Sequence, residues 1–372
     1  MLDTILWLIV VEVTGLMAFP ICHYLMPALR DRGYSVSKPL GLLILGYTSW
    51  ILSTTFQIPS IQPILLIILA IFLGISIWIF LNNRTLIQEC LVRERIRFFT
   101  TEFVFLTVFV FWVIYRAHDP YIDTTEQPMD FAFLNAVNQS TIGHPQDPWF
   151  SGESISYYYF GYWIMSIPGK LTAIPTAISY NLCLALIPAM AASGVFGLVS
   201  DLTQRGSSKL RPAFSAGLIS VVLLIFSGNL EGVLEFMHVN SMGSDRIWEW
   251  LGIAGLEGSK GTSSLFWIPD EYMWWWRATR TIGSYQGTQI VDYTIQEFPF
   301  FSFMLGDLHP HVMSIPFVVL LLTLFWAYLK NPSNGYPSGI KLKKNWSHNA
   351  AIILASGLGL GGLAFVNMWD FP

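Results

Sequence analysis

The feature that most constrains the fold is a series of apolar stretches long enough to cross a lipid bilayer. A membrane-spanning helix needs about 20 consecutive residues that are mostly apolar. Hydrophobic residues make up 53% of the 372-residue chain and charged residues only 12%, which is far from the composition of a soluble domain. The sequence therefore predicts an all-α polytopic membrane protein with about eight transmembrane helices. Their approximate bounds are 4–26, 39–56, 62–81, 99–115, 173–199, 212–226, 312–329 and 349–365.

Basic residues give the predicted helices an orientation. Most Lys and Arg residues fall in four of the connecting loops, and loops enriched in these residues stay in the cytoplasm. All four loops lie on one side only if the segment 157–169 is juxtamembrane or re-entrant, because a ninth span there would place Arg205, Lys209 and Arg211 outside. Two long external loops then remain, 116–172 and 227–301, and we expect them to carry juxtamembrane helices.

The predicted organisation has two parts. Residues 1–98 form an N-terminal three-helix membrane segment, and residues 99–372 form a membrane core with both external loops. The chain ends at Pro372 within an apolar helix, so we expect the protein to continue. The predicted location is the cell (plasma) membrane, with many passes. No basic patch or nucleotide-binding loop occurs, so neither nucleic acid nor a nucleotide cofactor is expected.

The first external loop carries a pair of carboxylates that suits acid–base chemistry. Pro128 is well placed to start a helix, and in a helix over 126–138 the residues Glu126 and Asp130, four apart, share one face. Such a pair can share a proton or a cation, or leave one group as a general base. The competing interpretation of Glu126 is that an acid at a helix N-terminus complements the helix dipole.

A second polar cluster precedes the apolar stretch 312–329. Asp307 and His311 are four residues apart and would share a helix face, while Pro310 tends to kink the chain there. Carboxylates and imidazoles bind divalent cations or act as a general acid–base pair, and the plainer interpretation is satisfied polar residues. Asp307, His309 and His311 are therefore candidate metal ligands, with His309 the least favoured because it points in a different direction.

A run of tryptophans with two arginines marks the second external loop. Arg277 and Arg280 follow Trp274, Trp275 and Trp276. Arginines supply fixed charge and paired donors for a phosphate, and tryptophans favour the headgroup level of a membrane. The alternative is an interfacial tryptophan anchor with solvated arginines.

Three motifs in order carry a resemblance over nearly the whole chain. They are Glu126-Gln-Pro-Met-Asp130, Tyr157-Tyr158-Tyr159, and Phe300-Phe-Ser-Phe-Met-Leu-Gly-Asp307-Leu-His309-Pro310-His311. With them the chain resembles the uncharacterised archaeal and bacterial membrane proteins named for their YYY motif. Its layout is also remotely similar to the GT-C superfamily of glycosyltransferases, in which an external acidic loop leads to a juxtamembrane helix. In GT-C enzymes that loop usually follows the first helix, whereas here it follows the fourth.

The GT-C similarity implies a function and roles for particular residues. It implies transfer of a sugar from a polyprenyl-phosphate donor on the external face, with membrane lipids around it and an acceptor left open. A divalent cation is an optional cofactor. Glu126 and Asp130 would be catalytic, and the substrate-binding residues would be Asp123, Tyr157, Tyr158, Tyr159, Arg277 and Arg280. The alternatives are a transporter or channel using Glu12 and Glu102 in the apolar stretches, and a non-enzymatic protein of envelope assembly.

Overall fold

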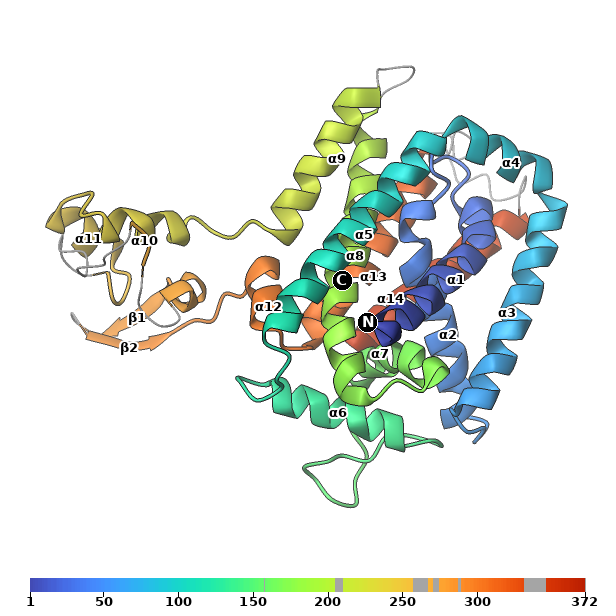
Figure 1. Cartoon of the computed structure of the whole chain (residues 1–372), viewed down its shortest axis with the longest axis horizontal. Helices are drawn as coiled ribbons and strands as arrows, with labels where there is room; N and C mark the ends of the chain where they lie inside the picture. The colour runs from blue at the N-terminus through green and yellow to red at the C-terminus, as the bar shows by residue number, and fades with distance from the viewer. Residues whose placement is uncertain are drawn as a thin grey trace. The chain divides into compact units, whose positions relative to one another are not determined.

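The described residues are mostly helical, and the chain forms two compact units (Figure 1). The computed structural model describes residues 1–156, 158–204, 210–256, 267–269, 274–286, 289–330 and 346–371. The first unit comprises Met1–Val221 and Gly306–Pro372, and the second comprises Val222–Leu305. The predicted all-α polytopic membrane architecture is confirmed.

All eight predicted apolar stretches are helices. They are α1 (Leu2–Leu25), α2 (Ser37–Thr54), α3 (Gln62–Asn82), α5 (Arg95–His118), α8 (Thr176–Thr203), α9 (Leu210–Ile225), α13 (Pro310–Lys330) and α14 (Trp346–Val366). Within the described residues, six of these helices are long and apolar enough to cross a membrane. The other two are α9, which has only 16 residues, and α2, which carries Lys38 in its first turn.

Helix α8 forms the centre of the first unit. In its most apolar stretch, 83% of the residues are buried. It packs against α5 and α13, and against the short helix η1 (Tyr34–Val36). Small residues make this possible, because a Cβ atom added at Gly197 would collide with the Ser35 side chain of η1.

The segment predicted as juxtamembrane or re-entrant is the short helix α7 (Tyr159–Thr172). It has 14 residues, too few to span a bilayer, and almost all of them are buried. It packs against α1, α2 and α14 and against α6 (Gln127–Gln139). A short, buried helix packed against the long helices α1, α2 and α14 agrees with the re-entrant interpretation.

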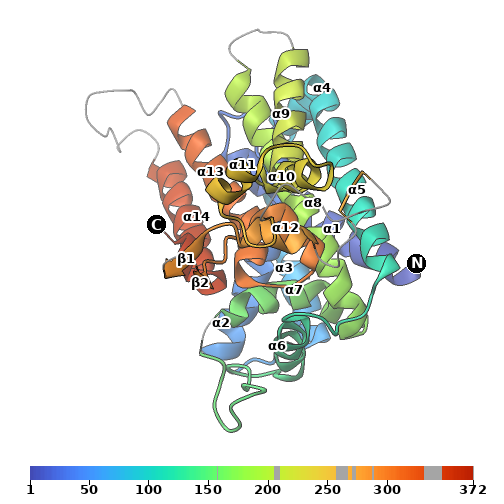
Figure 2. The same ribbon diagram turned by 90° about the vertical axis from the view of Figure 1, so that its left-hand side faces the viewer.

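The two ends of the first unit differ in their short helices. Helix α4 (Arg84–Arg93) lies at one end and α6 at the opposite end (Figures 1 and 2). The predicted cytoplasmic loop that contains Arg84 and Arg93 and the predicted external acidic loop therefore lie at opposite ends. Both predicted parts of the chain, 1–98 and the part from residue 99, contribute to this unit, because α1 and α2 pack against α7.

The second unit nearly coincides with the predicted external loop 227–301. It contains α10 (Glu231–Val239), α11 (Asp245–Leu251), η2 (Trp274–Thr279), the antiparallel hairpin of β1 (Gly283–Gln286) and β2 (Gln289–Tyr293), and α12 (Pro299–Leu305). Trp248, Ile253 and Leu256 form a small core. The hairpin is the part that the apolar pattern did not predict.

Replacement of Gly41 by alanine is expected to destabilise the first unit. The added Cβ atom would lie 2.6 Å from the carbonyl oxygen of Thr14, so α1 and α2 would have to move apart. Overpacking of this kind costs about 1–3 kcal/mol. The midpoint of thermal unfolding in detergent measures the effect. Gly74→Ala is the matched control, because nothing lies within 4 Å of its Cβ position, and equal midpoints for the two variants would contradict the expectation.

Candidate functional site

The first part of the site is the start of α6. The helix begins at Gln127, with Pro128 in its first turn, one residue later than the predicted start. Asp130 is fully buried, whereas 60% of the Glu126 side chain is exposed. The two carboxylates predicted to share a face therefore lie in different environments.

The second part of the site is the segment that leads into α13. Helix α13 begins at Pro310, so this proline starts a helix instead of kinking one, and Asp307 lies before the helix. The prediction that Asp307 and His311 share a helix face is therefore wrong. Tyr180 of α8 holds the segment, since its hydroxyl donates to the Gly306 carbonyl (3.2 Å) and accepts from the Leu308 amide (3.3 Å).

Gly306 has a conformation that few other residues could adopt. Its φ is +80°, in the left-handed region that favours glycine. A Cβ atom there would also lie 2.8 Å from a guanidinium nitrogen of Arg116. Glycine thus lets the chain turn closely past Arg116 before Asp307.

His309 brings the two parts together. Its Nε2 atom lies 2.9 Å from Glu126 Oε2, 3.8 Å from Asp130 Oδ2 and 3.9 Å from Asp307 Oδ2. We call Glu126, Asp130, Asp307 and His309 the carboxylate–histidine cluster. The residue that the sequence favoured least as a ligand is the one that contacts all three acids.

Two hydroxyl groups complete the cluster. The Tyr162 hydroxyl donates to Asp130 Oδ1 (2.6 Å), and the Thr125 hydroxyl donates to Asp307 Oδ1 (2.6 Å). The other oxygen of Asp130 is buried and has no hydrogen-bond partner in the part of the chain that the structure describes. Thr125 has a φ of +52°, which is rare for a β-branched residue and is a form of backbone strain that clusters at functional sites. Neither Tyr162 nor Thr125 was among the site residues predicted from the sequence.

Burial raises the pKa values of the two buried carboxyl groups of the cluster, Asp130 and Asp307. Removal from water raises the pKa of Asp130 to about 7, even though His309 and the Tyr162 hydroxyl act in the opposite direction. Burial also raises the pKa of Asp307, against the effects of Thr125 and His309. A carboxyl group that titrates near neutral pH is suited to proton transfer.

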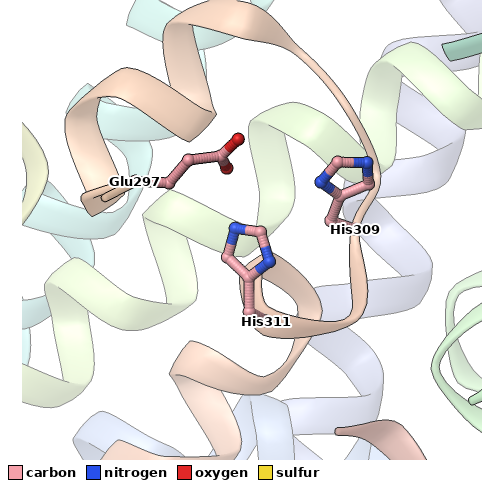
Figure 3. Close-up of side chains that lie close together, drawn as sticks. All are labelled: Glu297, His309 and His311. Carbon is pink, nitrogen blue, oxygen red and sulfur yellow. The ribbon is translucent and has the colours of Figure 1, made fainter. Parts of the chain in front are cut away.

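The histidine pair bears on the predicted metal ligands. The rings of His309 and His311 lie side by side, with centroids 5.4 Å apart (Figure 3). The inner oxygens of Asp130 and Asp307 face His309 Nε2, so oxygen and nitrogen donors for a divalent cation lie close together. The assignment of Asp307, His309 and His311 as metal ligands stays a prediction.

The two described residues of the tyrosine motif, Tyr158 and Tyr159, lie beside the cluster and not in it. Tyr157 falls outside the described residues. Tyr158 and Tyr159 line a cavity of about 370 Å³ together with Trp50, His144 and Phe365. The Tyr159 hydroxyl accepts a hydrogen bond from Trp50 Nε1 (2.8 Å) and lies 2.7 Å from His144 Nδ1. Tyr162, three residues after Tyr159, does reach the cluster.

The remaining predicted substrate-binding residues have other surroundings. Asp123 is exposed, two residues before Thr125. In the second unit, the Arg277 guanidinium donates to both oxygens of the buried Glu235, and Arg280 stacks 4.2 Å over the Trp276 ring. The charge of Arg277 is therefore compensated within its own unit.

Asp130→Asn is expected to flatten the pH dependence of stability between pH 3.8 and about 7. In this interval the folded wild-type protein keeps a proton on Asp130 that the unfolded chain releases, so stability falls as pH rises. The fall from this group is at most about 4 kcal/mol, and the asparagine variant lacks it. Thermal midpoints across this pH range measure the slope. Asp119→Asn is the control, because Asp119 is exposed. A slope in Asp130→Asn equal to that of the wild type would contradict a proton on buried Asp130 in the folded state.

Comparison with known proteins identifies a family. No curated protein and no solved structure matches the chain. Residues 44–372 match the family described as "Uncharacterized membrane protein (DUF2298)". Because this match covers most of the chain, the protein belongs to the DUF2298 family of membrane proteins.

Proposed function

We propose that this protein is a glycosyltransferase of the cell membrane that uses a polyprenyl-phosphate-linked sugar at the external surface. The observation that carries the proposal is the carboxylate–histidine cluster, in which an exposed Glu126 contacts His309 while two acids are buried behind it. The cluster lies where α13 begins, at an end of the membrane unit, which suits a lipid-linked substrate. The nature of the donor comes from the remote similarity to GT-C enzymes.

Glu126 is the proposed general base. Of the three acids in the cluster it is the exposed one, so an acceptor hydroxyl can reach it. As the acceptor oxygen bonds to the anomeric carbon, Glu126 takes the hydroxyl proton. The bond between that carbon and the phosphate oxygen of the carrier breaks, and the lipid phosphate leaves with the electron pair.

Asp130 and Asp307 are positioning residues in this scheme. Both are buried against His309, whose Nε2 atom also contacts Glu126, so they hold the imidazole that orients the base. Asp130, with a pKa of about 7, can also accept a proton relayed through the cluster near neutral pH. If a divalent cation binds, Asp307, His309 and His311 would hold it, and it would stabilise the developing phosphate charge.

Other predicted residues keep proposed roles in binding. Tyr158 and Tyr159 line the aromatic cavity next to α7, and sites for small ligands are commonly lined by such side chains. Asp123 lies close to the cluster in sequence and is exposed to an acceptor. Arg277 and Arg280 stay candidates for contact with the carrier phosphate.

Glu126→Gln is expected to lower sugar transfer by about 10²–10⁴-fold, because general base catalysis contributes that much. The measurement is transfer of radiolabelled sugar from polyprenyl-phosphate carriers in membranes that contain the full-length protein. Glu153→Gln is the matched control, since Glu153 is also an exposed glutamate of the same predicted loop. Equal transfer by Glu126→Gln and the wild type would overturn the assignment of the base.

Tyr162→Phe is expected to move the acidic limb of the pH–activity profile to higher pH. The lost hydrogen bond stabilises the ionised form of Asp130, so its removal raises the pKa of Asp130 further. A hydrogen bond to a charged group contributes about 1.5–3 kcal/mol, which corresponds to a shift of about 1–2 pH units. A profile that only loses height, without a shift along the pH axis, would show that Tyr162 does not act through Asp130.

A further inference from the structure

Three charged side chains meet inside the membrane unit, away from the carboxylate–histidine cluster. The Lys38 ammonium of α2 lies 2.5 Å from Glu102 Oε1 of α5 and 3.2 Å from Glu12 Oε2 of α1. Lys38 is buried and the two glutamates are half-buried. A Cβ atom added at Gly15 would collide with the Lys38 side chain, so the lysine stem lies tightly against α1.

The depth of these groups makes their charge costly. Glu12 is ten residues beyond the first residue of α1, which is about 15 Å along a helix of about 36 Å. Both α1 and α5 are among the helices long and apolar enough to span a membrane. Ionisable groups at such depth are rare and face partners or functional sites.

The three charges do not cancel. One ammonium and two carboxylates have a net charge of −1. The neighbouring groups that act on the glutamates are Lys38 and the Tyr34 phenol, which is hydrogen-bonded to Glu102 and is neutral. Phe105 offers only its ring face to Lys38, at 4.3 Å. Among the described residues, then, a single cation faces two acids.

One carboxylate oxygen among Glu12, Lys38 and Glu102 lacks a partner and can therefore accept a proton. Glu12 Oε1 is buried and has no hydrogen-bond partner in the described part of the chain. An ionised carboxylate oxygen that is shielded from water and has no partner is strongly destabilised, and such a group takes a proton instead.

We propose that Glu12, Lys38 and Glu102 form a proton-binding site within the membrane helices, holding one exchangeable proton between the two carboxylates at neutral pH. The proton comes from water and forms an O–H bond on one carboxylate, while the lysine stays an ammonium. The site does not depend on the proposed sugar transfer. It gives the membrane unit a group that changes charge at depth, as proton-coupled movements require.

Infrared spectroscopy of the full-length protein in lipid tests how many carboxyl groups of the site are protonated. Each variant is compared with the wild type at neutral pH in the carbonyl stretch of protonated carboxyl groups. Glu12→Gln and Glu102→Gln each leave one ammonium with one carboxylate, so each should remove one protonated carboxyl. Lys38→Met leaves two acids without a cation and should add one. Glu89→Gln, on the exposed face of α4, should change nothing.

The results that would overturn the site are equally specific. A band of the same intensity in the wild type and in both Gln variants contradicts a proton held by this pair, because Asp130 and Asp307 contribute equally to all three. A wild-type-minus-variant component that fails to shift in D₂O contradicts an exchangeable one. If the wild-type-minus-variant component is present in choline buffer and lost in sodium buffer, a metal cation is bound in place of the proton. If Lys38→Met does not fold, the two Gln variants still decide.

Discussion

The cost of removing a charge from water organises both polar sites of this molecule. In the first unit, Asp130 is fully buried and has a pKa of about 7. Glu12 and Glu102 lie in helices long and apolar enough to span a membrane, and Lys38 of α2 contacts both. A helix bundle that faces lipid has no water to solvate such groups, so each must find a partner or a proton. His309 is the partner in one site and Lys38 in the other. His309, just before α13, thus contacts the acids at the start of α6, and Lys38 of α2 contacts one acid each on α1 and α5.

The helices could be predicted from the sequence because their signal is local. Every predicted apolar stretch is a helix, since burial in lipid requires both apolar side chains and internally satisfied backbone groups. Predictions of where a helix begins and of what surrounds it were less accurate, because these depend on neighbouring helices. Pro310 starts α13 because the chain before it turns at Gly306, and α7 is enclosed because small residues of its neighbours let it approach.

The site was predicted in its chemistry but not in its arrangement. The spacing of Glu126 and Asp130 places them near each other, yet it could not show that one is exposed and the other buried. Contact between Asp130 and His309 joins segments far apart in the chain, and it depends on how α6 and α13 pack around α8. Tyr162 carried a usable signal, because it follows the tyrosine motif by one helical turn, whereas Thr125 carried none.

The way the chain enters α13 has a mechanical consequence. Leu305 ends the second unit, and His309 follows only four residues later, so covalent connectivity ties the cluster directly to that unit. Along the chain, α12 is followed first by Gly306 and then by Asp307 and His309. The Tyr180 hydroxyl hydrogen-bonds to both Gly306 and Leu308 and so holds this segment against α8. These two hydrogen bonds fix the backbone on both sides of Asp307, immediately before the imidazole that contacts Glu126.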